Sequence, residues 1–461
     1  GHYTMSCEDP THSSLWAKIS NATELSIDVS PLALPNDLSI MPLPFFDRRD
    51  ARTLSLPFVF ASAPDNTTLE AAGALSSWFG AQASYRGARF STNINQIPAH
   101  GNAVLLLSGP EALQIGGLSL PAAKGPTLSV MTNPNDANGK LLVISGRDAA
   151  ELKTATTALV LGSQALSGSS VVIDRLDTVQ PRKPYDAPNW LPSDRPVKLG
   201  ELLPAKQFNV SGYNPGDITV PLNFPPDLFT WRDEGAPLNL KYRYTPQEKS
   251  SNSSFIVSFN DGLIQSQNLL PQDKLESSVL KALKINDDTL NRETRVRLPL
   301  NSVALQSRLQ LRFMFDYIKQ GECGDIIIDN MRGSVDPEST LDLTGYDHFM
   351  AMPNLGVFKD AGFPFTRLAD LSQTAVVLPD NAGAAELDAY LTVLGRFGQS
   401  TGYPATGVLV MQAAQVQAAA DKDLLVFAAG NNQPLLTQWA DRLPAADIGD
   451  QQSFHLSDLP M

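Results

Sequence analysis

Residues 56–66 read LPFVFASAPDN and residues 374–381 read TAVVLPDN, two apolar runs that each end in Pro-Asp-Asn. A stretch of helical character follows each run and ends in Phe-Gly, at Gly80 and at Gly398, and a Tyr comes shortly after. The next apolar strands are residues 103–108 and 423–428. The pattern of strand, helix and second strand therefore occurs twice.

The two copies keep nearly the same offset. It is 315 residues from Asn66 to Asn381, 318 from Gly80 to Gly398, and 316 between the cysteines Cys7 and Cys323. Similar offsets across unrelated motifs predict the duplication of a two-domain unit. Chance similarity between strand–turn–helix segments is the alternative.

Residues 51–183 read strand, helix, strand, strand, helix, strand, with Asp148 at a helix N-cap position. Alternating strands and helices predict a parallel sheet with right-handed crossovers, as in a small flavodoxin-like domain. Residues 344–461 begin a second such domain. We expect it to be incomplete, because the sequence ends before the equivalents of the last strands of the first copy.

Residues 184–343 are rich in strand patterns. Residues 294–298 and 309–315 alternate apolar and polar side chains, and Asn260-Asp261-Gly262 is typical of a hairpin turn. A two-sheet jelly roll accommodates these strands. Residues 1–50 read as the C-terminal part of a first jelly roll, with a half-buried strand at 25–29 and a Pro-rich link from Pro31 to Pro44.

The predicted fold class is therefore mixed β and α/β, a tandem duplication of a β-sandwich jelly roll plus a flavodoxin-like domain. The expected domains are 1–50, 51–183, 184–343 and 344–461. Since the first jelly roll is mostly missing, we expect a piece of a longer protein.

Charge and composition argue against several classes of protein. The net charge is −13 and the Lys and Arg residues are scattered, which argues against a nucleic-acid surface. No run approaches the roughly 20 apolar residues of a membrane span. The five His residues are isolated, so neither a metal nor another cofactor is predicted.

Catalytic and nucleotide-binding motifs are also missing. There is no G-x-S-x-G, G-x-G-x-x-G or P-loop. The loop at 61–68 lacks glycines, Pro64 removes an N–H donor and Asp65 repels phosphate. Arg48 and Arg52 have the R-x-x-x-R spacing of cyclic di-GMP receptors, but a solvated or salt-bridging loop explains them better. No residue is predicted to be catalytic. Sequence spacing does not reveal a pair of carboxylates that only the folded chain brings together.

Carbohydrate binding is the chemistry that the aromatic residues favour, because apolar sugar faces stack on exposed rings. The candidates are Trp231, Tyr242, Tyr244, Trp190 and Trp16. Core packing is the alternative for each of them. Cys7 and Cys323 occupy equivalent positions in the two copies, so either a disulfide in an oxidising compartment or two separate thiols is expected.

The order of the domains resembles that of the B subunit of bacterial cellulose synthase. The matching stretches are GHYTMSCEDP at 1–10, SLWAK at 14–18, LPFFD at 43–47 and FDYIKQGECG at 315–324. The resemblance covers essentially the whole chain.

That resemblance implies a non-catalytic periplasmic protein in which two carbohydrate-binding-like jelly rolls alternate with two flavodoxin-like domains. It implies partnership with the cellulose synthase catalytic subunit, contact with the emerging β-1,4-glucan, self-assembly into a periplasmic crown, and a C-terminal anchor in the inner membrane that this chain lacks. Cyclic di-GMP is expected on the catalytic partner. A free carbohydrate-binding protein is the alternative, and a polysaccharide hydrolase is a third reading.

Overall fold

The computed structural model describes residues 16–30, 32–163, 165–213, 215–230, 234–247, 252–271, 290–300, 306–316, 331–429 and 432–442. The chain forms two compact units. The first comprises Gly1–Val29 and Trp190–Met352, and the second comprises Ser30–Asn189 and Pro353–Met461. The second unit therefore contains both α/β repeats, one on each side of the first unit in the sequence.

The first α/β repeat is built on a six-stranded sheet with the order β2-β1-β3-β7-β6-β8. The strands are β1 (Leu54–Phe60), β2 (Ala88–Ile94), β3 (Ala103–Ser108), β6 (Thr127–Asn133), β7 (Asp136–Gly146) and β8 (Ser170–Val172). Helices α1 (Asn66–Ala83) and α2 (Ala149–Leu161) cover one face, and the small hairpin of β4 (Leu113–Ile115) and β5 (Leu118–Leu120) lies at a second, smaller core. The predicted N-cap is confirmed, since Asp148 accepts a hydrogen bond from the N–H of Glu151.

The prediction of an all-parallel sheet is wrong at one strand. β2, β1, β3 and β7 are parallel, but β6 is antiparallel to both β7 and β8. Only a short turn separates the end of β6 at Asn133 from the start of β7 at Asp136, and a link of that length joins antiparallel neighbours. The helix that a parallel crossover would need between β3 and β7 is replaced by strands β4 to β6.

The second α/β repeat has the same beginning. Its strands β21 (Thr374–Leu378), β22 (Leu409–Gln412) and β23 (Asp423–Val426) form a parallel sheet with the order β22-β21-β23, and α5 (Ala384–Thr401) connects β21 to β22. The short helices α4 (Leu355–Ala361) and α6 (Pro434–Gln438) flank it. Since β2-β1-β3 is the corresponding order in the first repeat, the predicted duplication is confirmed for this part of the chain.

Strands β2 and β22 were not predicted from the sequence, in which the second strand of each repeat was expected at 103–108 and 423–428. In the structure β2 and β22 precede those strands and pair with β1 and β21. β2 is an edge strand with alternating buried and exposed residues and an Arg at its second position, so its apolar signal is weak.

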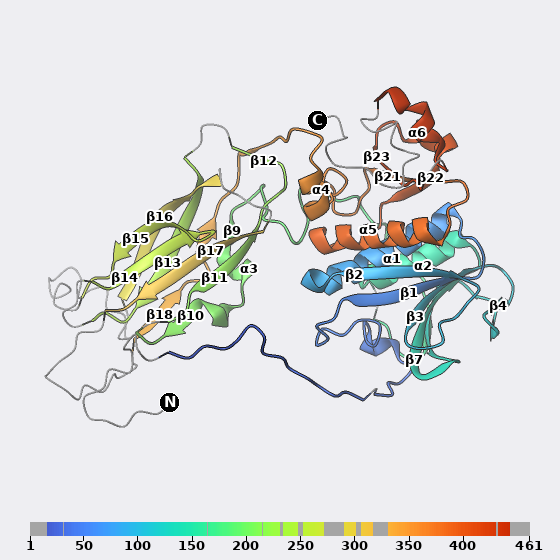
Figure 1. The fold of residues 1–461 in the computed structure, drawn as a ribbon, viewed down its shortest axis with the longest axis horizontal. Helices are drawn as coiled ribbons and strands as arrows, with labels where there is room; N and C mark the ends of the chain where they lie inside the picture. The colour runs from blue at the N-terminus through green and yellow to red at the C-terminus, as the bar shows by residue number, and fades with distance from the viewer. Residues whose placement is uncertain are drawn as a thin grey trace. The chain divides into compact units, whose positions relative to one another are not determined.

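Helices α1 and α5 are equivalent elements of the two repeats, and they pack against each other (Figure 1). Both have 18 residues, and an offset of 318 relates their first and last residues. A Cβ at Gly80 would collide with the carbonyl oxygen of Gly395, and a Cβ at Gly398 would collide with that of Ser77. The same offset relates Gly80 to Gly398 and Ser77 to Gly395, so the two contacts are images of each other. The helix pair is thus an isologous interface within one chain.

A second pair of contacts obeys the same symmetry. Asp388 on α5 accepts hydrogen bonds from the backbone N–H and the hydroxyl of Thr92 on β2, at 2.6 and 2.7 Å. Glu70 on α1 accepts one from the backbone N–H of Val410 on β22, at 3.2 Å. The offset of 318 relates Glu70 to Asp388 and Thr92 to Val410. Each helix therefore holds the second strand of the other repeat with a carboxylate.

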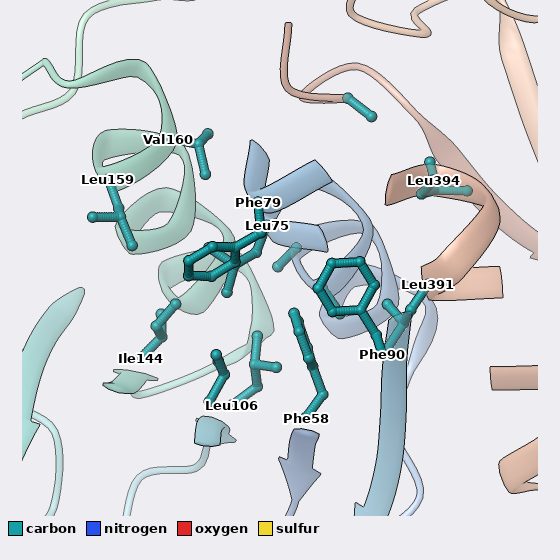
Figure 2. Close-up of a cluster of buried hydrophobic side chains, with 14 of the residues drawn as sticks. Phe58, Leu75, Phe79, Phe90, Leu106, Ile144, Leu159, Val160, Leu391 and Leu394 are labelled. Carbon is teal, nitrogen blue, oxygen red and sulfur yellow. The ribbon is translucent and has the colours of Figure 1, made fainter. Parts of the chain in front are cut away.

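One hydrophobic core joins the two repeats. Figure 2 shows Phe58, Leu75 and Phe79 on the side of the first sheet and α1, with Phe90 next to Leu391 of α5. Phe58 and Phe90 meet edge to face with 5.4 Å between the ring centroids. Because residues of both repeats share one buried cluster, neither repeat completes its core alone.

The first unit is an antiparallel β structure with two facing sheets around one core. One sheet has β10, β18, β13, β19 and β9 in order, with β16 paired to β13, and the other has the order β11-β17-β14-β15. Its elements are β9 (Val197–Lys198), α3 (Leu199–Leu202), β10 (Asn209–Ser211), β11 (Ile218–Asn223), β12 (Leu228–Phe229), β13 (Ala236–Tyr244), β14 (Ser254–Phe259), β15 (Gly262–Asn268), β16 (Leu290–Leu298), β17 (Gln306–Met314), β18 (Arg332–Val335), β19 (Thr340–Leu341) and β20 (Asp347–His348). The predicted hairpin turn is confirmed, because Asn260 and Asp261 join β14 to β15 with positive φ values.

The strand predicted at 25–29 is not formed. Leu25, Ile27 and Val29 are exposed, and no described strand pairs with this segment. An alternating pattern creates a strand only where a neighbouring strand accepts its hydrogen bonds. Among the described helices, none is both long and apolar enough to cross a bilayer.

Candidate functional site

The outer face of the sheet that contains β13 carries a polar concave surface. Along β13 the side chains alternate, so that Leu240, Tyr242 and Tyr244 enter the core while Lys241 and Arg243 are exposed. The neighbouring β16 also alternates, and Asn291 and Glu293 lie opposite Arg243 and Lys241. The period of two along each strand thus produces a face of cations, amides and carboxylates.

Two adjoining hollows of about 560 and 310 Å³ cross this face and share Arg243 and Ser334. We call them together the polar groove. The side chains that define it are Asn209, Ser211, Lys241, Arg243, Asn291, Arg292, Glu293, Arg332, Ser334 and Asp336.

The strand register arranges part of the groove as a row. Asn291 on β16 lies opposite Arg243 on β13, Arg243 opposite Ser334 on β18, and Ser334 opposite Asn209 on β10. Neighbouring strands are about 4.8 Å apart, so the row offers a hydrogen-bonding side chain at short, regular steps across four strands. A chain of linked polyols laid across the strands would meet one such group at nearly every ring.

The groove is polar without being a strong anion site. Lys241, Arg243 and Arg332 supply donors, and Glu293 and Asp336 supply acceptors. A mixture of charged donors and acceptors suits vicinal hydroxyl groups, which donate and accept at the same time. The two carboxylates offset part of the positive charge that a phosphate would need.

Tyr242 and Tyr244, two of the predicted sugar contacts, are core residues with 4% and 1% of their surface exposed. The Tyr242 hydroxyl donates to Gln267 Oε1 at 3.1 Å, and the Tyr244 hydroxyl accepts from the N–H of Leu270 at 2.8 Å. Burial raises the pKa of Tyr242, and it raises the pKa of Tyr244 to about 12. Both phenols are therefore neutral at ordinary pH, and neither ring is an exposed stacking surface.

Trp190 and Trp16, the other aromatic candidates that the structure describes, are not among the residues that line the groove. Trp190 is buried, and its indole N–H has no acceptor among the described residues. Trp16 is 76% exposed in a segment without regular structure. Trp231 lies outside the described residues.

The remaining sequence-based expectations concern the cysteines and metals. Cys7 and Cys323 lie outside the described residues, so their pairing stays a prediction. Within the described part of the chain, no group of three His, Asp or Glu side chains is arranged to hold a metal ion.

The helix N-termini of the second unit, where an α/β domain would place a phosphate, are capped by protein groups. At α1, Asp65 accepts from the N–H of Thr68, and Asn66 exchanges amide hydrogen bonds with Gln412 of the other repeat. At α5, the Glu386 carboxylate accepts from the N–H of Gly383. A phosphate would meet a carboxylate at the N-terminus of each of these two helices, as the position of Asp65 in the sequence indicates for α1.

Four family models match the chain, and each describes a domain of cellulose synthase BcsB. They are the first CBM domain at residues 1–31, the first FD domain at 37–173, the second CBM domain at 196–340 and the second FD domain at 348–458. The chain belongs to the BcsB family of cellulose synthase subunits. The mixed β and α/β fold class agrees with this series of CBM and FD domains, and the groove lies on the second CBM domain.

Curated BcsB relatives carry the name cyclic di-GMP-binding protein. The chain is 62% identical to that of Pseudomonas fluorescens over all of its own residues and 61% of the relative. It is 36% identical to that of Escherichia coli K12, covering 93% of the chain and 55% of the relative, and 37% identical to that of Komagataeibacter xylinus, covering 92% and 53%. The chain thus spans a little more than half the length of these relatives.

The polar groove was not predicted as a site from the sequence. The signal was present in the alternating KYRY of β13 and NRETRVRL of β16, of which only residues 294–298 were predicted to have one face on a core and one face in water. Which polar residues of distant strands share a row depends on register, which the alternation alone does not give.

Proposed function

We propose that this chain is the periplasmic part of a non-catalytic cellulose synthase subunit that supports the membrane catalytic subunit and guides the emerging β-1,4-glucan. The observation that carries the proposal is the polar groove on a domain of the BcsB family's CBM type. In the same proposal, the first unit is a jelly roll and the repeats of the second unit are flavodoxin-like. The full-length protein is anchored in the inner membrane and assembles into a crown.

The chemistry of the groove suits a guide better than a tight receptor. Hydrogen bonds from Lys241, Arg243 and Asn291 to sugar hydroxyls exchange with water, so each contributes little net affinity. Among the described residues, the buried Tyr242 is the one Trp, Tyr or Phe that contributes to its lining. A polymer that must move onward benefits from many weak contacts along a row rather than from one stacked ring.

The first experiment is glucan synthesis from UDP-glucose by the reconstituted catalytic subunit, with and without the full-length form of this protein. The proposal expects synthesis to require the protein. If synthesis proceeds equally well without it, the supporting role is wrong and a free periplasmic carbohydrate-binding protein becomes the leading account.

The groove is tested separately by titrating this chain with cellotetraose and following NMR shifts or heat. Arg243→Ala removes a charged donor from the centre of the row and is expected to weaken binding about tenfold. Arg308→Ala is the matched control, because Arg308 pairs with Asp261 on the opposite sheet. Equal affinity for both variants would show that the groove is not the glucan site.

A further inference from the structure

A cavity of about 650 Å³ lies on the first α/β repeat, in the second unit and so on a different unit from the polar groove. Its volume is within the range of small-molecule sites, roughly 300 to 1,000 Å³. We propose that this cavity binds a single-chain amphiphilic anion, of which a fatty carboxylate is the simplest example.

The cavity lies on the face of the first sheet that is turned away from α1 and α2. Leu128 of β6 and Ile144 of β7 enter the core that contains the residues of these helices. Ser129 and Val143, one position along each strand, line the cavity on the other face. The sheet thus forms the floor, and residues 120–124, which begin at the end of β5, form one wall.

Apolar side chains from five strands make up the greater part of this floor and wall. They are Leu107 of β3, Leu120 of β5, Met131 of β6, Val143 of β7 and Val172 of β8. Val172 is 40% exposed, so part of this apolar surface is in contact with water. A hydrocarbon chain that covers it removes apolar surface from water on both partners, which favours binding.

Hydroxyl groups interrupt the apolar floor at positions that the strand register fixes. Ser129 on β6 lies opposite Ser170 on β8, and their hydroxyl oxygens are 2.7 Å apart. One of these two hydroxyls donates to the other, which leaves one O–H of the pair for a ligand. Ser145 on β7 is half-buried, and its hydroxyl forms no hydrogen bond within the described part of the chain.

The polar groups at the exposed edge of the cavity are donors. Lys124 is exposed and, among the described residues, is the one charged side chain of the lining. The carboxamide oxygen of Asn36 accepts from Lys140 Nζ at 2.8 Å and from Thr132 Oγ1 at 3.2 Å. These two bonds orient the carboxamide and leave its N–H groups as donors.

Charge decides which kind of ligand fits these donors. The chain has a net charge of −13, yet no Asp or Glu is among the described residues that line this cavity. An ammonium and an amide N–H select a group that accepts hydrogen bonds and carries negative charge. A free phosphate would leave the apolar floor uncovered, and a glucan would place hydroxyls against it. A hydrocarbon chain with an anionic head group satisfies both parts of the cavity.

The test titrates this chain with octanoate and decanoate below their critical micelle concentrations, followed by calorimetry and methyl NMR. We expect saturable binding, with shifts at the methyl groups of Leu107, Met131 and Val143. Decanoate should bind about tenfold more tightly than octanoate, since each buried methylene contributes about fourfold. The neutral 1-octanol should bind more weakly than octanoate, because it lacks the charge that Lys124 attracts.

Two variants locate the ligand. Val172→Trp fills the cavity and should weaken decanoate binding by about tenfold or more, whereas Val179→Trp, at another exposed valine of the same unit, should not. Lys124→Ala should weaken it about threefold, as expected for an exposed ion pair, and Lys183→Ala is the matched control. Thermal unfolding shows that each variant is folded.

Three outcomes overturn the proposal. One is that decanoate binds the folded Val172→Trp variant as tightly as the wild-type chain. Another is that 1-octanol binds as tightly as octanoate, which would leave an apolar surface without selection for an anion. The third is that the cavity serves another occupant: Val172→Trp would then change sedimentation of the chain or its binding to phosphatidylglycerol vesicles without changing decanoate binding, which would indicate self-association or membrane contact.

Discussion

The two α/β repeats begin with the same strand order and connect β1 to α1 and β21 to α5 in different ways. In the first repeat Asp65 of the Pro-Asp-Asn motif caps α1 directly. In the second the same motif is followed by Ala382 and Gly383, and Glu386 from within the helix closes its end. The helices nevertheless keep a common offset of 318 residues and meet through reciprocal contacts. The turns of the two repeats thus differ, whereas the helix interface is symmetric and each of its contacts depends on the other repeat.

The largest expected effect comes from adding a methyl group at the helix crossing. Gly80→Ala and Gly398→Ala each place a Cβ against a backbone carbonyl that cannot turn aside. Overpacking of this kind costs about 3 kcal/mol or more, beyond the roughly 1 kcal/mol that Ala gains over Gly in a helix. Chemical denaturation measures the free energy of unfolding.

Gly216→Ala is the control for these two variants, since a Cβ at Gly216 meets no atom within 4 Å. If the interface is symmetric, the two helix variants should lose similar stability. A large loss for only one of them would contradict the reciprocal packing.

A smaller effect is expected at the two carboxylates that hold β2 and β22. Glu70→Ala leaves the N–H of Val410 without its acceptor and removes the partner of Lys153, whose Nζ lies 2.6 Å from Glu70 Oε2. Loss of these buried contacts should cost about 2 to 3 kcal/mol. Asp388→Ala should cost about 1 kcal/mol, because Asp388 is only partly buried.

Hydrogen exchange at the backbone N–H groups of Thr92 and Val410 distinguishes the two sites. Asp388→Ala should speed exchange at Thr92, and Glu70→Ala should speed exchange at Val410. Unchanged exchange at both positions would show that the carboxylates do not hold the strands.

The smallest effect separates the two ways of starting a helix. Asp65→Ala removes the side chain that accepts the N–H of Thr68 at 2.7 Å and should cost about 1 kcal/mol. Glu386→Ala should cost less, because Gly383 is exposed and its N–H can bond to water instead, whereas Thr68 is buried. Thermal unfolding compares the two, and an equal or larger loss for Glu386→Ala would reverse this ranking of the caps.

Much of the secondary structure could be predicted because it depends on local patterns. Apolar runs placed β1, β3, β21 and β23, and Asp148 marked the start of α2. β2 and β22 were missed because each takes its hydrogen bonds and part of its packing from elements far away in the sequence. The aromatic candidates Tyr242 and Tyr244 illustrate the same limit, since composition does not show which face of a strand is buried.

By itself the sequence determined the duplication, the alternation of β and α/β regions and the resemblance to a cellulose synthase subunit, because repeats and periodicities are properties of neighbouring residues. Only the tertiary structure decided that equivalent helices face each other and that Asn291, Arg243, Ser334 and Asn209 share a row. The physical reason is that register and close packing bring together residues whose separation along the chain carries no information about their contact.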